Sequence, residues 1–144
     1  MTVAKQVWER FTEVSRAAKA STERRLSGYN VHVGQQFVLE CLWQEDGLTP
    51  SELSRRIGVE AATLTRALSR MEAARLVHRE PDPRDRRRIR TWLTDTGREL
   101  REPITREMAD LQAEAVALLS PEEARQLVEL LGRMGRSLRG ESAT

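Results

Sequence analysis

Residues 48–97 read LTPSELSRRIGVEAATLTRALSRMEAARLVHREPDPRDRRRIRTWLTDTG, and the order of the signals in this stretch decides the fold. The run TPSE at 49–52 predicts the start of a helix. Threonine suits the N-cap, proline the first helical position and glutamate the acid of a capping box. The short helix that follows is expected to bury Leu53 and Ile57 and to end at Gly58.

A second helix is predicted over residues 61–74, with Leu64, Leu68 and Met71 on its buried side. At about 100° per residue, the opposite face is small, polar and basic, as a helix that enters the major groove of DNA must be. An arginine such as Arg66 can bind guanine O6 and N7. The alternative for this face is an ordinary solvated surface. The candidate base-reading residues are Ala62, Thr63, Thr65, Arg66, Ser69 and Arg70.

A β-hairpin is predicted after the second helix. Residues 76–79 look extended, and residues 89–93 alternate with the period of a strand, so that residues 80–88 form the turn between them. The run DPRDRRRIR at 82–90 is by itself compatible with a solvated charge run. Its place between two strands, after a basic helix, favours the ordered wing of a winged helix-turn-helix.

Positive charge is concentrated in the same part of the chain. Residues 48–93 carry eleven basic and six acidic side chains, a net charge of +5, whereas residues 1–47 sum to zero and residues 94–144 to −3. This distribution is typical of a surface that binds a polyanion. Arg55 and Arg56 are candidates for phosphate contacts, because their helix would cross the DNA backbone, although one of them can instead pack its stem over the core.

The N-terminal part of the chain predicts two further helices. The first reaches about Leu26 and carries an apolar stripe of Val7, Phe11, Val14 and Ala18. The second carries Val33, Phe37 and Cys41 on its apolar side and ends before Asp46. Cys41 is therefore expected to be an inert core residue.

The C-terminal part predicts one long helix and one final helix. Apolar residues keep a single phase from Leu100 to Leu118, with Pro103 as the place where the long helix would kink. The run SPEE at 120–123 repeats the earlier start signal. The apolar residues of the final helix are Leu127, Leu130, Leu131, Met134 and Leu138.

Several classes of protein are not expected. An apolar run of about 18 residues is absent, and the charged start MTVAKQVWERF has no signal-peptide core, so we expect a cytoplasmic protein without a membrane span. A single cysteine and two histidines exclude an internal disulfide and give no metal motif. Catalytic and phosphate-loop arrangements are also absent, so neither an enzyme nor a cofactor is expected.

Residues 48–97 resemble the DNA-binding domain of the MarR family of bacterial transcription regulators. The family's D-x-R-D-x-R element is present as Asp82, Arg84, Asp85 and Arg87, followed by the L-T-x-x-G element with Gly97 at its end. The helices on either side fit the family layout, so the resemblance covers nearly the whole chain. One departure is Arg75, which stands where the family often has glycine before the wing. The start of the reading helix also has fewer hydrogen-bonding side chains than usual.

The resemblance implies a mainly α fold with a small β-hairpin, forming one domain over residues 1–144. Residues 31–97 would form the winged helix-turn-helix, embedded between dimerisation helices at about 1–30 and 98–144. The apolar outer helices independently favour a homodimer, because a monomer of this layout does not easily bury them.

The resemblance also implies roles in the wing. Asp82 would orient Arg84, and Arg84 would enter the minor groove. Arg86, Arg87 and Arg88 would contact phosphates or pair with the wing aspartates. Pre-ordering by a carboxylate would reduce the entropy that an arginine loses on binding.

Many members of the family release DNA when a small aromatic or anionic effector binds. Trp8, Tyr29 and His32 are candidates for lining such a site, although each also fits an ordinary packing or surface role. The expected function is that of a sequence-specific, double-stranded DNA-binding regulator, a repressor that acts on a pseudo-palindromic operator. The alternative is a winged helix that binds DNA without sequence preference or mediates protein contacts.

Overall fold

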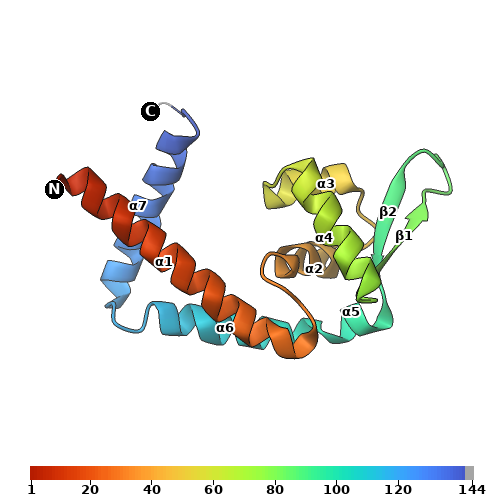
Figure 1. The fold of residues 1–144 in the computed structure, drawn as a ribbon, viewed down its shortest axis with the longest axis horizontal. Helices are drawn as coiled ribbons and strands as arrows, with labels where there is room; N and C mark the ends of the chain where they lie inside the picture. Colours follow the sequence, from red (N-terminus) through yellow and green to blue (C-terminus); the bar gives the residue numbers. More distant parts are fainter. Residues whose placement is uncertain (142–144) are drawn as a thin grey trace. The chain divides into compact units, whose positions relative to one another are not determined.

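The computed structural model describes residues 1–141 as a mostly helical chain with a two-stranded hairpin (Figure 1). Contacts divide it into two compact units, Met1–Met108 and the part that begins at Ala109. No helix of residues 1–141 is long and apolar enough to cross a membrane. In chain order the elements are α1 (Val3–Leu26), the 3-10 turn η1 (Ser27–Tyr29), α2 (Gln35–Gln44), α3 (Pro50–Ile57), α4 (Ala61–Ala73), β1 (Val77–Pro81), β2 (Ile89–Leu93), α5 (Asp95–Glu99), α6 (Arg101–Ala115) and α7 (Pro121–Leu138).

The helix-turn-helix forms where the sequence predicts it. The Thr49 hydroxyl accepts from the Glu52 amide at 3.3 Å, and the Glu52 carboxylate accepts from the Thr49 amide at 2.9 Å, which completes the capping box of α3. Helix α3 ends at Gly58, whose φ of 78° is a left-handed conformation that glycine adopts without strain. The turn then leads directly into α4.

The core of the first unit joins α2, α3, α4 and the base of the hairpin. Leu53 and the predicted triad of Leu64, Leu68 and Met71 are fully buried, as expected. Ile57 is only half-buried, because it lies at the end of α3 beside a surface hollow. The remaining fully buried apolar side chains include Leu26, Val31, Val38, Leu39, Leu42, Leu76, Val77 and Ile104.

The predicted hairpin forms and is antiparallel, with Val77 opposite Leu93 and Pro81 opposite Ile89. Its first strand extends to Pro81, so Glu80 and Pro81 belong to the strand and not to the predicted turn at 80–88. Its base is fixed to α5 by a close approach at Gly97. A Cβ atom at this position would lie 2.3 Å from the Leu76 carbonyl oxygen, so only glycine fits there without a backbone shift. Close packing against Leu76 therefore explains why the L-T-x-x-G element ends in glycine.

The prediction for the apolar face of α2 was wrong. Val33 lies before the helix, and Phe37 is 49% exposed. The buried face consists instead of Val38, Leu39 and Leu42. Helix α2 carries apolar residues on two faces, and the spacing alone did not distinguish the face that meets the core from the one beside the hollow.

The predicted long C-terminal helix was also wrong. The chain breaks at Leu100, between α5 and α6, so Pro103 falls in the first turn of α6 and not inside a helix. Proline is tolerated in a first turn because the amide that it lacks has no partner there. Helix α6 ends at Ala115, and Leu118 lies in the following turn with 99% of its surface exposed.

The outer helices present apolar side chains to solvent. In α1, Val7, Trp8, Phe11 and Val14 are exposed, and only Thr22 and Leu26 are buried. Helix α7 begins with the predicted capping box of Ser120 and Glu123. Its exposed apolar residues include Leu127, Leu130, Leu131 and Leu138, and it buries none of its residues.

Candidate nucleic-acid interface

The side of α4 opposite the core is exposed, small and basic. The Arg66 and Arg70 guanidinium groups form no hydrogen bond or ion pair with the described residues, so both can bind another molecule. The Thr65 hydroxyl donates to the Ala61 carbonyl at 2.9 Å, so its oxygen remains an acceptor. The exposed positions of α4 include all six candidate base-reading residues: Ala62, Thr63, Thr65, Arg66, Ser69 and Arg70.

The two arginines of α3 have different surroundings. Arg55 is exposed, and its side chain has no partner among residues 1–141. Arg56 forms an ion pair with Glu45 and lines the hollow beside α2. Of the two, Arg55 is the better candidate for a phosphate contact. Arg56 is more consistent with the other possibility, that its stem packs against the protein.

The wing turn is ordered by its own hydrogen bonds. The Asp82 amide donates to the Arg88 carbonyl at 2.7 Å, and the Arg88 amide donates to the Asp85 carbonyl at 2.9 Å. The Asp82 and Asp85 carboxylates accept from the amides of Arg84 at 2.9 Å and Arg87 at 3.1 Å. The charged run is therefore a defined turn and not a disordered loop.

Arg90 is the ion-pair partner of Asp82, at 2.9 Å. The same guanidinium donates to the Gly47 carbonyl at 2.7 Å, so it fixes the wing to the loop before α3. The sequence reasoning did not identify Arg90 as the partner of Asp82, although Arg90 directly precedes the buried Thr91 and lies eight positions after Asp82. The Arg84 amide first, and Arg90 second, hold the pKa of Asp82 below its ordinary value.

The other wing arginines divide into paired and free side chains. Arg87 pairs with Asp85 at 3.4 Å. Pairing with a wing aspartate was one of the two roles expected for it, and a phosphate contact was the other. The guanidinium groups of Arg84, Arg86 and Arg88 are exposed and form no hydrogen bond or ion pair within the described part of the chain. Asp82 contacts Arg84 through the backbone amide, and the Arg84 guanidinium has no partner among the described residues.

Helix α4 and the wing are held together by Glu72 and Arg79. The Glu72 carboxylate accepts from the Arg79 guanidinium at 3.1 Å and from its amide at 3.0 Å. These bonds lower the pKa of Glu72. Between them, Arg75 has a φ of 61°, a left-handed conformation that favours glycine.

The three candidate effector residues do not form one crevice within a chain. The Trp8 and Phe11 rings form a tilted pair with centroids 5.8 Å apart. His32, by contrast, lies beyond the other end of α1, where it contacts Glu23 at 2.7 Å. Leu26 lies 18 residues after Trp8, a rise of roughly 27 Å at 1.5 Å per residue. Tyr29 is half-buried in η1.

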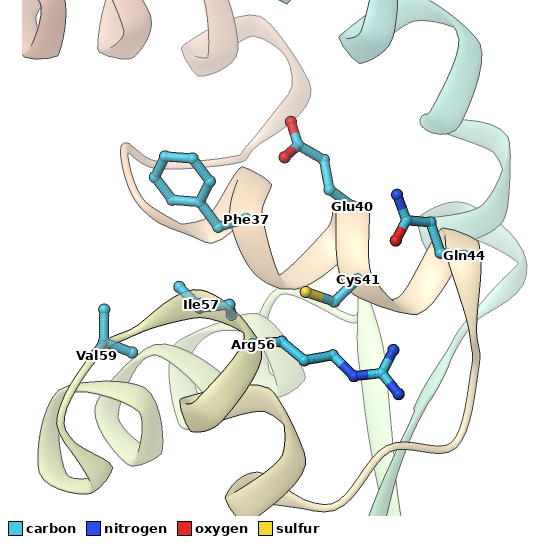
Figure 2. Close-up of a pocket in the computed structure, with 7 residues that line it drawn as sticks. All are labelled: Phe37, Glu40, Cys41, Gln44, Arg56, Ile57 and Val59. Atoms are coloured by element: carbon cyan, nitrogen blue, oxygen red, sulfur yellow. The ribbon is translucent and has the colours of Figure 1, made fainter. Parts of the chain in front are cut away.

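Cys41 does not lie in the core, contrary to the prediction. It is half-buried and lines the hollow between α2 and the end of α3 (Figure 2). Burial still raises the pKa of its thiol. Among residues 1–141, no group of three or more histidine, cysteine, aspartate or glutamate side chains could hold a metal ion.

An exposed basic helix after a tight turn, followed by an ordered arginine-rich hairpin, defines a winged helix-turn-helix DNA-binding protein. The MarR family model matches residues 33–89. The uncharacterized HTH-type transcriptional regulator YdgJ of Bacillus subtilis (strain 168) is 30% identical over 126 residues, which cover 79% of this chain and 77% of YdgJ. The chain therefore belongs to the MarR family and is a transcriptional regulator, not an enzyme.

Two other relatives agree with this assignment. The HTH-type transcriptional regulator MgrA of Staphylococcus aureus is 28% identical over 106 residues, which cover 74% of this chain and 71% of MgrA. The crystal structure of the S. aureus MepR–DNA complex matches with a TM-score of 0.83 and 27% identity, over 95% of this chain and 98% of that chain. This chain thus has the same fold as MepR, whose structure was determined in complex with DNA.

Proposed function

We propose that this protein is a homodimeric repressor that binds a pseudo-palindromic operator in the bacterial cytoplasm. The observation that carries the proposal is the exposed face of α4, where arginines that have no partner within residues 1–141 lie beside small polar residues. A helix with this composition fits the major groove, since Arg66 can reach guanine and Thr65 and Ser69 can meet either kind of base edge.

The wing complements α4 in this proposal. Arg84 would enter the minor groove, and Arg86 and Arg88 would contact phosphates. Ordering of the turn by Asp82 supports these roles, because a pre-ordered loop loses less entropy on binding. Arg55 would add a phosphate contact from α3.

The outer helices would form the dimer, with residues 1–30 and 98–144 as dimerisation segments around the DNA-binding part at 31–97. The exposed apolar residues of α1 and α7 support this division, because single chains rarely leave such stripes uncovered. A small aromatic or anionic effector would release the DNA. Trp8, Tyr29 and His32 could share a site only if two chains supplied them.

Selection of bound genomic fragments, followed by sequencing, tests the proposal. We expect an inverted repeat whose half-sites lie about one helical turn apart, roughly 10 base pairs, as for other dimeric helix-turn-helix proteins. Enriched fragments without a common sequence would favour a winged helix that coats DNA, and no enrichment would favour one that mediates protein contacts. The genes beside the operator would suggest the effector.

A further inference from the structure

Only residues 74–76 connect α4, the helix proposed to read bases, to the first strand of the wing. In this connection Arg75 has a φ of 61°, and its carbonyl accepts from the Thr94 hydroxyl at 2.7 Å. Leu76 is fully buried, and its amide donates to the Met71 carbonyl at 3.0 Å. The connection therefore fixes the base of the hairpin to the end of α4.

The wing turn lies well beyond this base, so a small tilt of the hairpin moves the turn a long way. Strand β1 advances from Val77 to Pro81 before the turn begins, a rise of roughly 13 Å at about 3.3 Å per residue. A tilt of about 10° at the base would thus displace the turn by roughly 2 Å. This displacement exceeds the range of about 0.5 Å over which N–H···O distances vary. A fixed base alone therefore does not hold the wing arginines at a defined distance from Arg66.

Glu72 of α4 attaches to the hairpin above its base. One oxygen of its carboxylate accepts from the Arg79 amide at 3.0 Å, and the other accepts from the Arg79 guanidinium at 3.1 Å. Arg79 is the middle residue of β1. The Arg79 side chain is 29% exposed, so water and salt screen this charge pair less than they screen a fully exposed one. Helix α4 thus holds β1 at two levels, at the base of the strand and at its middle.

The other strand is held at the same level from the opposite side. Thr91, the register partner of Arg79, donates its amide to the Leu48 carbonyl at 2.9 Å. The hairpin is therefore held on both edges, by Glu72 of α4 on one edge and by the loop before α3 on the other. Loss of the Glu72 bonds would leave the hairpin attached at this level by one edge, about which it could tilt.

We propose that Glu72 is a positioning residue, which sets the distance between the base-reading face of α4 and the wing. Both oxygens of its carboxylate are engaged by Arg79, so Glu72 acts through the hairpin and does not itself contact DNA. The Glu72–Arg79 pair makes α4 and the wing one rigid unit, which selects DNA whose major-groove bases and neighbouring minor groove lie at one spacing. This inference rests on the proposed function, because it requires that α4 and the wing bind the same half-site.

The experiment measures how well each protein tolerates a change in that spacing. A set of operators from the genomic selection carries one extra base pair at each successive step across both half-sites. One base pair separates two contacts by about 3.4 Å along the axis and by about a tenth of a turn. Fluorescence anisotropy gives the insertion penalty, which is the ratio of the dissociation constants of the lengthened and the original operator. A loss of folded protein cancels in this ratio, because both duplexes meet the same fraction of folded protein.

Glu72→Ala should reduce the insertion penalty at the steps between the bases read by α4 and the minor groove under the wing. For the unsubstituted protein an insertion there removes one of the two contacts, so binding should weaken about tenfold or more, the effect of one mismatched base pair. In Glu72→Ala the hairpin can tilt toward the displaced groove, so the penalty should fall to about threefold or less. Insertions at the operator centre, which change the distance between the half-sites, should cost both proteins the same.

Two further variants serve as controls. Glu72→Gln keeps the volume of the side chain and one acceptor oxygen, so its penalty should lie between those of the unsubstituted protein and Glu72→Ala. If Glu72→Ala does not fold, Glu72→Gln carries the comparison, and a penalty equal to that of the unsubstituted protein overturns the inference. Glu102→Ala breaks an exposed ion pair of α6, with Arg106, and should keep the unsubstituted penalty.

The possible results separate this inference from the proposed function. Equal penalties in the unsubstituted protein and Glu72→Ala would overturn the inference alone, as would an unsubstituted protein that tolerates every insertion within a half-site. An equal reduction of the penalty in Glu102→Ala would contradict the specific role of Glu72. Binding without preference for the operator over random duplex would contradict the proposed function, and the inference with it.

Discussion

Arg66 shows at the residue scale how the surface of α4 would distinguish one sequence from another. Its guanidinium is exposed and without a partner in the described chain, so it need not break an ion pair to bind a base. A bidentate contact of this kind contributes about 1–3 kcal/mol of discrimination against the wrong base.

Arg66→Ala should therefore weaken operator binding much more than binding to random duplex. Fluorescence anisotropy titrations at one salt concentration would measure both affinities. Arg133→Ala, which removes an exposed arginine of α7, is the matched control and should change neither. Equal losses on operator and random DNA would remove Arg66 from the base-reading set.

Asp82 stabilises the wing in a pH-dependent manner. Its folded pKa lies below the ordinary value of 3.8, because the Arg84 amide and Arg90 favour the ionised form. The stabilisation is thus fully present above that ordinary value and is lost as the pH falls through the lowered folded pKa.

Asp82→Asn should therefore lower the urea midpoint at neutral pH, and its difference from the unsubstituted protein should shrink at acidic pH. Urea denaturation followed by circular dichroism at several pH values measures this difference. A difference that stays constant from neutral pH to below the ordinary aspartate value would show that the charge of Asp82 does not stabilise the fold.

At the element scale, the sequence predicted the parts that local chemistry specifies. The capping-box motifs correctly predicted where α3 and α7 begin, and the alternation of residues 89–93 correctly predicted the hairpin. It failed where the outcome depends on tertiary packing. Phe37 and Val38 are adjacent apolar residues of α2. Val38 is buried and Phe37 is exposed because only the Val38 side of the helix faces the core. The partner of Asp82 was missed for the same reason, since Arg90 reaches it across the hairpin.

Gly97 gives the sharpest test of how α5 meets the hairpin. Gly97→Ala should destabilise the protein by about 1–3 kcal/mol, the usual cost of overpacking, because the new Cβ would meet the Leu76 carbonyl. Gly28→Ala is the matched control, since a Cβ there meets nothing within 4 Å. Thermal unfolding would compare the two variants, and a Gly97→Ala protein as stable as Gly28→Ala would contradict this packing.

At the scale of the whole molecule, the apolar stripes of α1 and α7 favour an assembly larger than one chain. Light scattering should give twice the chain mass of 16.4 kDa. Leu131→Glu should shift the mass toward the monomer, because it places a charge in the apolar stripe of α7. Glu129→Ala, on the opposite face of the same helix, should remain dimeric. A monomer at micromolar concentration for the unsubstituted chain would overturn the dimer.

The exposed face of α4, the ordered wing and the proposed dimer all lead to the central proposal that this protein recognises a particular DNA sequence. The most direct test is the ratio of its affinities for the selected operator and for random duplex of equal length at moderate salt. A sequence-specific regulator should give a ratio of about 10³ or more. A ratio near one would contradict the claim.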